Sequence, residues 1–221
     1  MKPEVAAVIF DLDGTLIDSL EDLADAVNTA LAEHGLPVHP VEPYKYFVGD
    51  GMETLVRRAA PEGTPDGALA SVFARVKAEY GKNWAVKTKP YEGVPAMLER
   101  LAALGVPLAV LSNKPHEFTG EVVTHFFPET PFAAVLGSPV GGKAKPEPAM
   151  ALAVAEKLAL APGRIAIMGD SRTDMDTAAN AGMLPIGVLW GFRPEDELLS
   201  HGAKVVLAKP GDLFYRVGLG G

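Results

Sequence analysis

Short apolar runs recur along the chain, and each is continuous instead of alternating between apolar and polar residues. A strand covered by helices on both faces has this continuous pattern, whereas a strand with one face in water alternates. The runs occupy residues 5–10, 107–111, 133–136, 164–168 and 184–189, and a weaker run occupies 204–207. Helical patterns separate most of them. This order predicts an α/β fold with a doubly wound, Rossmann-like parallel sheet.

Residues 17–89 break the alternation, because they contain no clear strand pattern. One helical face is formed by Leu20, Leu23, Ala24, Val27 and Leu31. Ser19 and Asp22 have the spacing of a capping box at the start of this helix. Two more helices are predicted near residues 52–60 and 67–84. We therefore predict an all-helical domain inserted after the first strand.

The predicted domain boundaries follow from where the sheet pattern stops and resumes. The α/β core domain comprises residues 1–16 and 90–221, and the helical domain comprises residues 17–89. Two linkers, near residues 15–19 and 88–91, would join the domains.

Composition narrows the function classes. The chain has 221 residues and a net charge of −8, which argues against nucleic acid or an anionic membrane as the main partner. No segment reaches about 18 consecutive apolar residues, so a membrane span is not expected. The absence of cysteine excludes disulfides, thiol nucleophiles and thiolate metal sites. A reducing cytoplasm fits this composition, and we expect the protein there.

Polar side chains follow the predicted strands at the points where they end. The first four runs are followed by Asp11, by Ser112 and Asn113, by Lys143 and Lys145, and by Asp170 and Asp174. The carboxyl ends of parallel strands share one edge of the sheet, and ligands bind beyond that edge. We therefore expect these side chains to converge on one site.

The collected residues favour phosphate chemistry. Clustered carboxylates repel one another unless a cation joins them, and oxygen ligands suit Mg²⁺, which also binds substrate phosphate. A lysine and a serine nearby suit an anionic ligand. A carboxylate can attack phosphorus and form an aspartyl-phosphate. We therefore expect Asp11 to attack, and Asp13 to protonate the leaving oxygen and later deprotonate water.

The motifs "DLDGT", "SN", a lysine and "GDSRTD" follow one another from Asp11 to Asp174. This order resembles the haloacid-dehalogenase-like superfamily, which consists mostly of Mg²⁺-dependent phosphatases. The helical segment resembles the cap of that family. The stretches "FVGDGMETLVRRA" and "PYEGVPAMLERL" resemble its phosphoglycolate phosphatase branch. The resemblance covers essentially the whole chain.

The resemblance implies metal-binding and catalytic roles for four carboxylates. Asp11 would be the nucleophile and a metal ligand. Asp13 would be the general acid and base, and would bind metal through its carbonyl. Asp170 would be the third metal ligand, and Asp174 would bind metal weakly or orient its water shell. Asp174 also suits the first turn of a helix without any metal.

The resemblance also implies phosphate-binding roles. Thr15 and Ser112 would bind the phosphoryl group with help from the Asn113 backbone. Lys145 would neutralise its charge, and is preferred to Lys143 because it precedes a proline and a helix.

For some polar residues the sequence does not decide between a role in substrate binding and a structural role. They are Asp50 in its glycine-flanked loop, Arg57, Arg58 and Arg172.

The expected function is Mg²⁺-dependent hydrolysis of a small phosphorylated metabolite, with 2-phosphoglycolate as the first candidate. Other reactions on the same core remain open: a sugar-phosphate phosphatase or phosphomutase, a pyrophosphatase or a nucleotidase. A non-catalytic phosphometabolite-binding module is disfavoured because every motif residue is intact. We expect a monomer or a homodimer.

Overall fold

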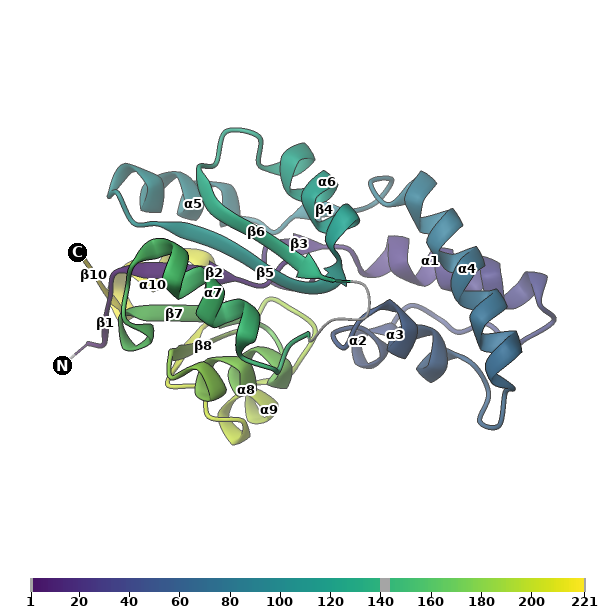
Figure 1. Ribbon diagram of the computed structural model, residues 1–221. Helices are drawn as coiled ribbons and strands as arrows, with labels where there is room; N and C mark the ends of the chain where they lie inside the picture. Colours follow the sequence, from purple (N-terminus) through teal and green to yellow (C-terminus); the bar gives the residue numbers. More distant parts are fainter. Residues whose placement is uncertain (1, 140–143, 221) are drawn as a thin grey trace.

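The computed structural model describes residues 2–139 and 144–220 (Figure 1). Its centre is a six-stranded parallel sheet with the strand order β6-β5-β2-β7-β8-β9. The strands are β2 (Ala7–Phe10), β5 (Leu108–Pro115), β6 (Phe132–Ser138), β7 (Ile165–Gly169), β8 (Leu184–Val188) and β9 (Val205–Leu207). Each corresponds to one of the apolar runs. The predicted α/β parallel sheet is therefore confirmed.

The central strand β2 shows why the apolar runs are continuous. Alternate residues of β2 pack into different hydrophobic clusters. Val8 and Phe10 pack with α5 (Val94–Ala103), whereas Ala7 and Ile9 pack with α7 (Ala149–Leu158) and α8 (Arg172–Ala181). Both faces of the strand are thus buried under helices, and neither tolerates polar side chains. The sheet edge that carries the site lies at the carboxyl end of this strand.

Shorter elements complete the fold around the sheet. Helix α6 (His116–Phe126) follows β5, and α9 (Glu195–Ser200) and α10 (Leu213–Arg216) flank β9 along the chain. Near the termini, β1 (Glu4–Val5) pairs with β10 (Gly218–Leu219) in a separate parallel pair. None of the helices in residues 2–139 and 144–220 is both long and apolar enough to cross a membrane.

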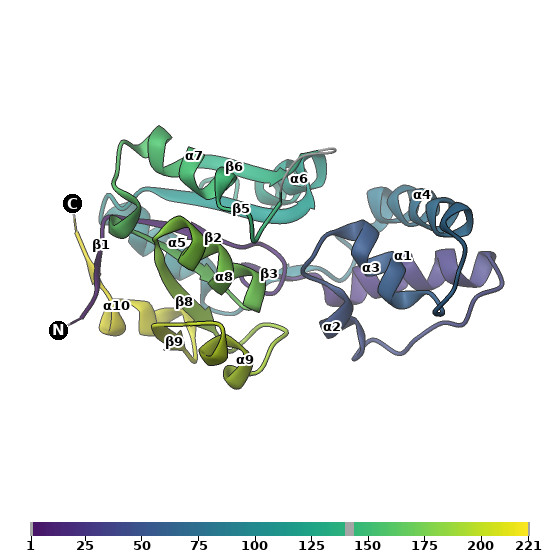
Figure 2. The same ribbon diagram turned by 60° about the horizontal axis from the view of Figure 1, so that its bottom comes forward.

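Helices within residues 17–89 lie together beyond the carboxyl end of the sheet (Figures 1 and 2). They are α1 (Leu20–Glu33), α2 (Tyr44–Phe47), α3 (Met52–Ala59) and α4 (Asp66–Asn83). Their apolar faces form a cluster of their own, joined from the sheet side by Phe118 and Phe192. The helical lid, as we call residues 17–89, is thus seen as a spatial group. Its status as a separate domain stays a prediction.

The two linkers of the lid differ from the sequence-based prediction. They form a short antiparallel pair, β3 (Ile17–Asp18) with β4 (Lys89–Pro90), where no strand was expected. The predicted capping box at Ser19 is wrong, because Ser19 Oγ donates instead to Asp13 Oδ1 at 2.6 Å. Asp22 accepts hydrogen bonds from Lys87 and Thr88 in the second linker. These longer-range partners outcompete the local cap.

Candidate active site

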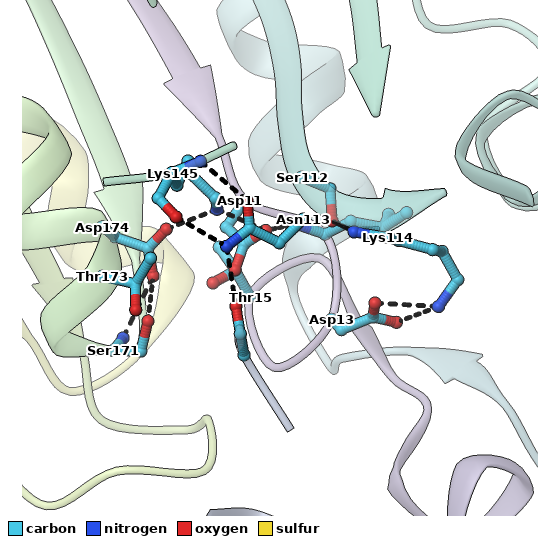
Figure 3. Close-up of polar contacts among 12 residues, drawn as sticks. Asp11, Asp13, Thr15, Ser112, Asn113, Lys114, Lys145, Ser171, Thr173 and Asp174 are labelled. Carbon is cyan, nitrogen blue, oxygen red and sulfur yellow. Dashed lines mark hydrogen bonds and ion pairs between the residues drawn. The ribbon is translucent and has the colours of Figure 1, made fainter. Parts of the chain in front are cut away.

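The site lies where β2, β5 and β7 end side by side (Figure 3). Asp11 follows β2, Ser112 and Asn113 lie near the end of β5, and Asp170 follows β7. The parallel register brings them together, since Phe10 pairs with both Val110 and Met168. The predicted convergence of strand ends is therefore seen in the structure.

The loop after β2 is folded by its own backbone. Asp11 N donates to Met168 O at 2.9 Å, and Leu12 N donates to Asp11 Oδ1 at 2.7 Å. Gly14 adopts a φ of 85°, which other residues rarely adopt. A Cβ on Gly14 would also collide with the Asp170 carboxylate. The glycine of "DLDGT" is therefore required for close approach as well as for the turn.

Asp11, Asp170 and Asp174 form a buried carboxylate cluster. One oxygen from each lies within 4.8 Å of the others. Burial, together with the charge of Asp174, raises the pKa of Asp11 to about 7, although Lys145 opposes this shift. Burial and the neighbouring carboxylates also raise the pKa of Asp170 well above its usual range. Such a cluster of oxygen donors could hold a cation, because a cation would offset this repulsion.

Lys145 joins two members of the cluster. Its Nζ lies 2.8 Å from Asp11 Oδ1 and 2.6 Å from Asp174 Oδ1. Burial lowers the pKa of the Lys145 ammonium, but the charges of Asp11 and Asp174 outweigh this effect and raise it. The lysine is therefore a fixed positive charge beside Asp11. Its predicted competitor, Lys143, lies outside the described residues.

Asp174 is held by the start of α8 as well as by Lys145. Its Oδ2 accepts hydrogen bonds from Ser171 N at 3.1 Å and from Ser171 Oγ at 2.7 Å. Ser171 and Asp174 thus form a capping box, and Asp174 is fully buried. The helix-start role considered for Asp174 is seen, and its other oxygen, Oδ1, accepts a hydrogen bond from Lys145 Nζ.

The Asp13 side chain lies apart from the carboxylate cluster (Figure 3). Its oxygens accept hydrogen bonds from Lys114 Nζ at 2.7 and 2.8 Å, and one also accepts from Ser19 Oγ. Lys114 is buried, and the charge of Asp13 raises the pKa of the lysine against the lowering effect of burial. Sequence reasoning missed Lys114. Its position directly after the "SN" motif was the available signal.

Asn113 ties three segments together through its side chain. Its amide nitrogen donates to Gly49 O in the lid and to Lys145 O, both at 3.0 Å. Its amide oxygen accepts a hydrogen bond from Lys145 N at 2.8 Å. The sequence predicted only a backbone role for Asn113. The side chain therefore also positions Lys145 and the adjoining lid loop.

The predicted hydroxyl ligands lie at the same edge. Ser112 is buried, and its Oγ accepts a hydrogen bond from Lys114 N at 3.2 Å. Thr15 is buried as well, and its Oγ1 lies 3.5 Å from Asp170 Oδ1. The Thr15 hydroxyl thus borders the carboxylate cluster, while Ser112 lines the same cavity as Asp11.

Of the four residues left open between a substrate role and a structural role, Asp50 contacts both Arg58 and Arg172. Asp50 pairs with Arg58 within the lid, accepts a hydrogen bond from Thr173 Oγ1 at 2.9 Å, and lies 3.6 Å from Arg172. Arg57 instead pairs with the exposed Asp66 at 3.2 Å. The contacts of Asp50 therefore join the lid loop to the start of α8.

A small cavity separates the lid from the sheet edge. About 40 Å³ of it is open to the centres of water molecules. Its lining residues are Asp11, Asp13, Leu23, Val48, Gly49, Gly51, Met52, Leu55, Ser112, Asn113, Lys114 and Pro115. A larger neighbouring cavity of about 670 Å³ shares part of this wall, namely Gly51, Met52, Asn113 and Pro115.

Comparison with known proteins places these features in a family. Residues 8–188 match the haloacid dehalogenase-like hydrolases. The phosphoglycolate phosphatase of Pseudomonas putida is 36% identical over 86% of this chain and 72% of its own length. That of Psychrobacter arcticus is 36% identical over 84% of each chain.

Solved structures agree with the sequence matches. One is a Lactobacillus delbrueckii subsp. bulgaricus protein whose phosphoglycolate phosphatase activity is a prediction. It superimposes with a TM-score of 0.89 and 32% identity, covering 96% of this chain and 97% of its own. Rhodobacter sphaeroides CbbY, solved with phosphate, shares the fold at a TM-score of 0.74 and 20% identity, over 95% and 96% of the two chains.

Proposed function

The chain belongs to the haloacid dehalogenase-like hydrolase family and is a phosphatase for a small phosphorylated substrate, and we propose that this substrate is 2-phosphoglycolate. The observation that carries the proposal is the contact of Lys145 with Asp11 beside a cavity of about 40 Å³. The names of the curated relatives support the choice of substrate.

In the first proposed step, Asp11 attacks the phosphorus atom. A bond forms between a carboxylate oxygen of Asp11 and phosphorus, and the bond from phosphorus to the leaving oxygen breaks. Asp13 gives a proton to that oxygen, which leaves as the hydroxyl of glycolate. Lys145 offsets negative charge on the phosphoryl oxygens, and Thr15, Ser112 and the Asn113 backbone N–H bind them.

In the second proposed step, water releases the phosphate. Asp13, now ionised, removes a proton from water as the water oxygen bonds to phosphorus. The bond between phosphorus and Asp11 breaks, which restores the carboxylate and frees inorganic phosphate. Because Asp13 serves as acid and then as base, it regains its proton for the next cycle.

We propose Mg²⁺ as the cofactor. The buried carboxylates of Asp11, Asp170 and Asp174 supply hard oxygen donors within 4.8 Å of one another, which fits this ion. Asp11, Asp170 and the carbonyl of Asp13 would hold it. Asp174 would act through water, since its oxygens already accept hydrogen bonds from Ser171 and Lys145. The bound ion would supply positive charge to the phosphoryl oxygens.

The helical lid is the proposed selector of substrate. Leu23, Val48, Met52 and Leu55 of the lid line the cavity. Closure of the lid would exclude water from the aspartyl-phosphate and would limit the size of the leaving group. We further propose that the protein acts in the cytoplasm, as a monomer or homodimer, without nucleic acid or membrane partners.

The test is phosphate release by the purified protein. We expect 2-phosphoglycolate to give the highest kcat/KM in a panel with glucose 6-phosphate, pyrophosphate and AMP. Activity should require Mg²⁺, should be poor with Ca²⁺, and should be lost in the Asp11→Asn control. Full activity after exhaustive chelation, or a higher kcat/KM for another member of the panel, would contradict the proposal.

A further inference from the structure

Lys114 is a buried cation between the sheet edge and the lid. Its side chain is 3% exposed, and its Nζ lies 2.7 and 2.8 Å from the two Asp13 oxygens. The same Nζ lies 4.8 Å from the ring centre of Tyr80 in α4. An ammonium group has three N–H donors. Its hydrogen bonds to Asp13 occupy two of them, and the third is available to a ligand only in competition with the adjacent Tyr80 side chain.

Charge in the cavity wall is distributed unevenly. Among the described residues that line the cavity, Lys114 is the only cation. Asp11 and Asp13 lie on the sheet side, and the lid side contributes the apolar side chains of Leu23, Met52 and Leu55. A neutral polyol would have few hydrogen-bond partners on this lid side. A small anionic group could pair with the Lys114 ammonium, which is already shielded from water.

Lys114 contacts the residue that is proposed to protonate the leaving group. In the proposed function, which this inference rests on, Asp13 protonates the leaving oxygen. Because Lys114 contacts Asp13 directly, its ammonium would lie close to the part of a bound substrate that follows this oxygen. We propose that Lys114 binds the carboxylate of the leaving group and makes the enzyme selective for small phosphorylated hydroxy acids over neutral alkyl phosphates.

The test compares two substrates of matched length. 2-Phosphoglycolate carries a carboxylate where 2-hydroxyethyl phosphate carries a neutral alcohol. We expect the wild-type protein to prefer 2-phosphoglycolate at least about tenfold in kcat/KM. Lys114→Met should reduce this ratio by about 10- to 100-fold, as expected for a lost charge-assisted hydrogen bond. Lys45→Met, at an exposed lid lysine paired with Glu42 at 2.9 Å, should leave the ratio unchanged.

Equal losses on both substrates would overturn the inference, since Lys114 would then act only by positioning Asp13. Inhibition by the alcohol product gives a second measurement, which needs no variant. Glycolate should inhibit the wild-type enzyme competitively, and ethylene glycol at the same concentration should not. A wild-type ratio near one, or equal inhibition by the two alcohols, would overturn the inference while leaving the proposed function standing. A protein that hydrolyses neither substrate with Mg²⁺ would overturn both.

Discussion

The Asp22 carboxylate accepts hydrogen bonds from both the backbone N–H and the hydroxyl of Thr88, at 2.8 and 2.7 Å. Lys87 N donates to the same carboxylate at 2.9 Å. Asp22 lies in the first turn of α1 and is buried, whereas Thr88 directly precedes β4. One side chain thus fastens the first helix of the lid to the linker by which the chain leaves it.

Asp22→Ala should destabilise the protein, because it leaves buried donors of the second linker without a partner. We expect a loss of about 2–4 kcal/mol in the free energy of unfolding, measured by urea denaturation. Asp25→Ala is the control, since Asp25 is exposed and pairs with the flexible end of Lys87 at 2.7 Å. That control should change stability by less than about 1 kcal/mol. Equal effects of the two substitutions would contradict the assignment.

Lys145→Ala should lower kcat/KM by about 10²-fold or more, because it removes the cation that contacts Asp11. Lys143→Ala provides the comparison and should have a far smaller effect. Both variants would be assayed for phosphate release at saturating Mg²⁺. The reverse order of effects would show that Lys143 is the charge-neutralising lysine.

Asp13→Asn should have an effect that depends on the leaving group. An alkoxide needs a proton as it leaves, whereas p-nitrophenolate is a weak base and hardly needs one. We expect the first step to slow by roughly 10²- to 10⁴-fold with an alkyl phosphate, and clearly less with p-nitrophenyl phosphate. Single-turnover release of alcohol or p-nitrophenolate measures this step alone. Equal slowing with both substrates would mean that Asp13 does not protonate the leaving group.

The metal-free protein should lose stability as pH rises. Burial raises the pKa of Asp11 from its usual 3.8 to about 7, so the folded state binds more protons than the unfolded state between these values. Stability therefore falls as pH increases through this window. Urea midpoints in EDTA should decrease from pH 5 to pH 8, and Asp11→Asn should flatten the decrease. A flat or rising wild-type profile in EDTA would contradict this expectation.

The sheet could be predicted because each of its strands is marked by a local run of apolar residues. A strand buried on both faces must be apolar at every position, and Ala7, Val8, Ile9 and Phe10 satisfy this without reference to any partner. The residues at strand ends could also be predicted to converge, because parallel strands share an edge. Asp11, Ser112 and Asp170 were found in this way.

The contacts between lid and core could not be predicted, because they depend on how distant segments dock. Ser19 has the spacing of a helix cap but donates to Asp13, and Asp22 binds a linker far along the chain. Lys114 follows a recognisable motif, yet its burial against Asp13 depends on where the lid lies. Asn113 similarly contacts Gly49 only because the lid loop approaches the sheet edge.

In the proposed mechanism, phosphate becomes covalently attached to Asp11. The direct measurement is rapid acid quenching after mixing the protein and Mg²⁺ with p-nitrophenyl phosphate labelled at phosphorus with ³²P. Asp13→Asn should accumulate labelled protein, because it lacks the base for the second step, and the label should map to the peptide that contains Asp11. Asp11→Asn should carry no label and should not turn over. Steady phosphate release without labelled protein in any variant, or turnover that survives Asp11→Asn, would contradict this mechanism.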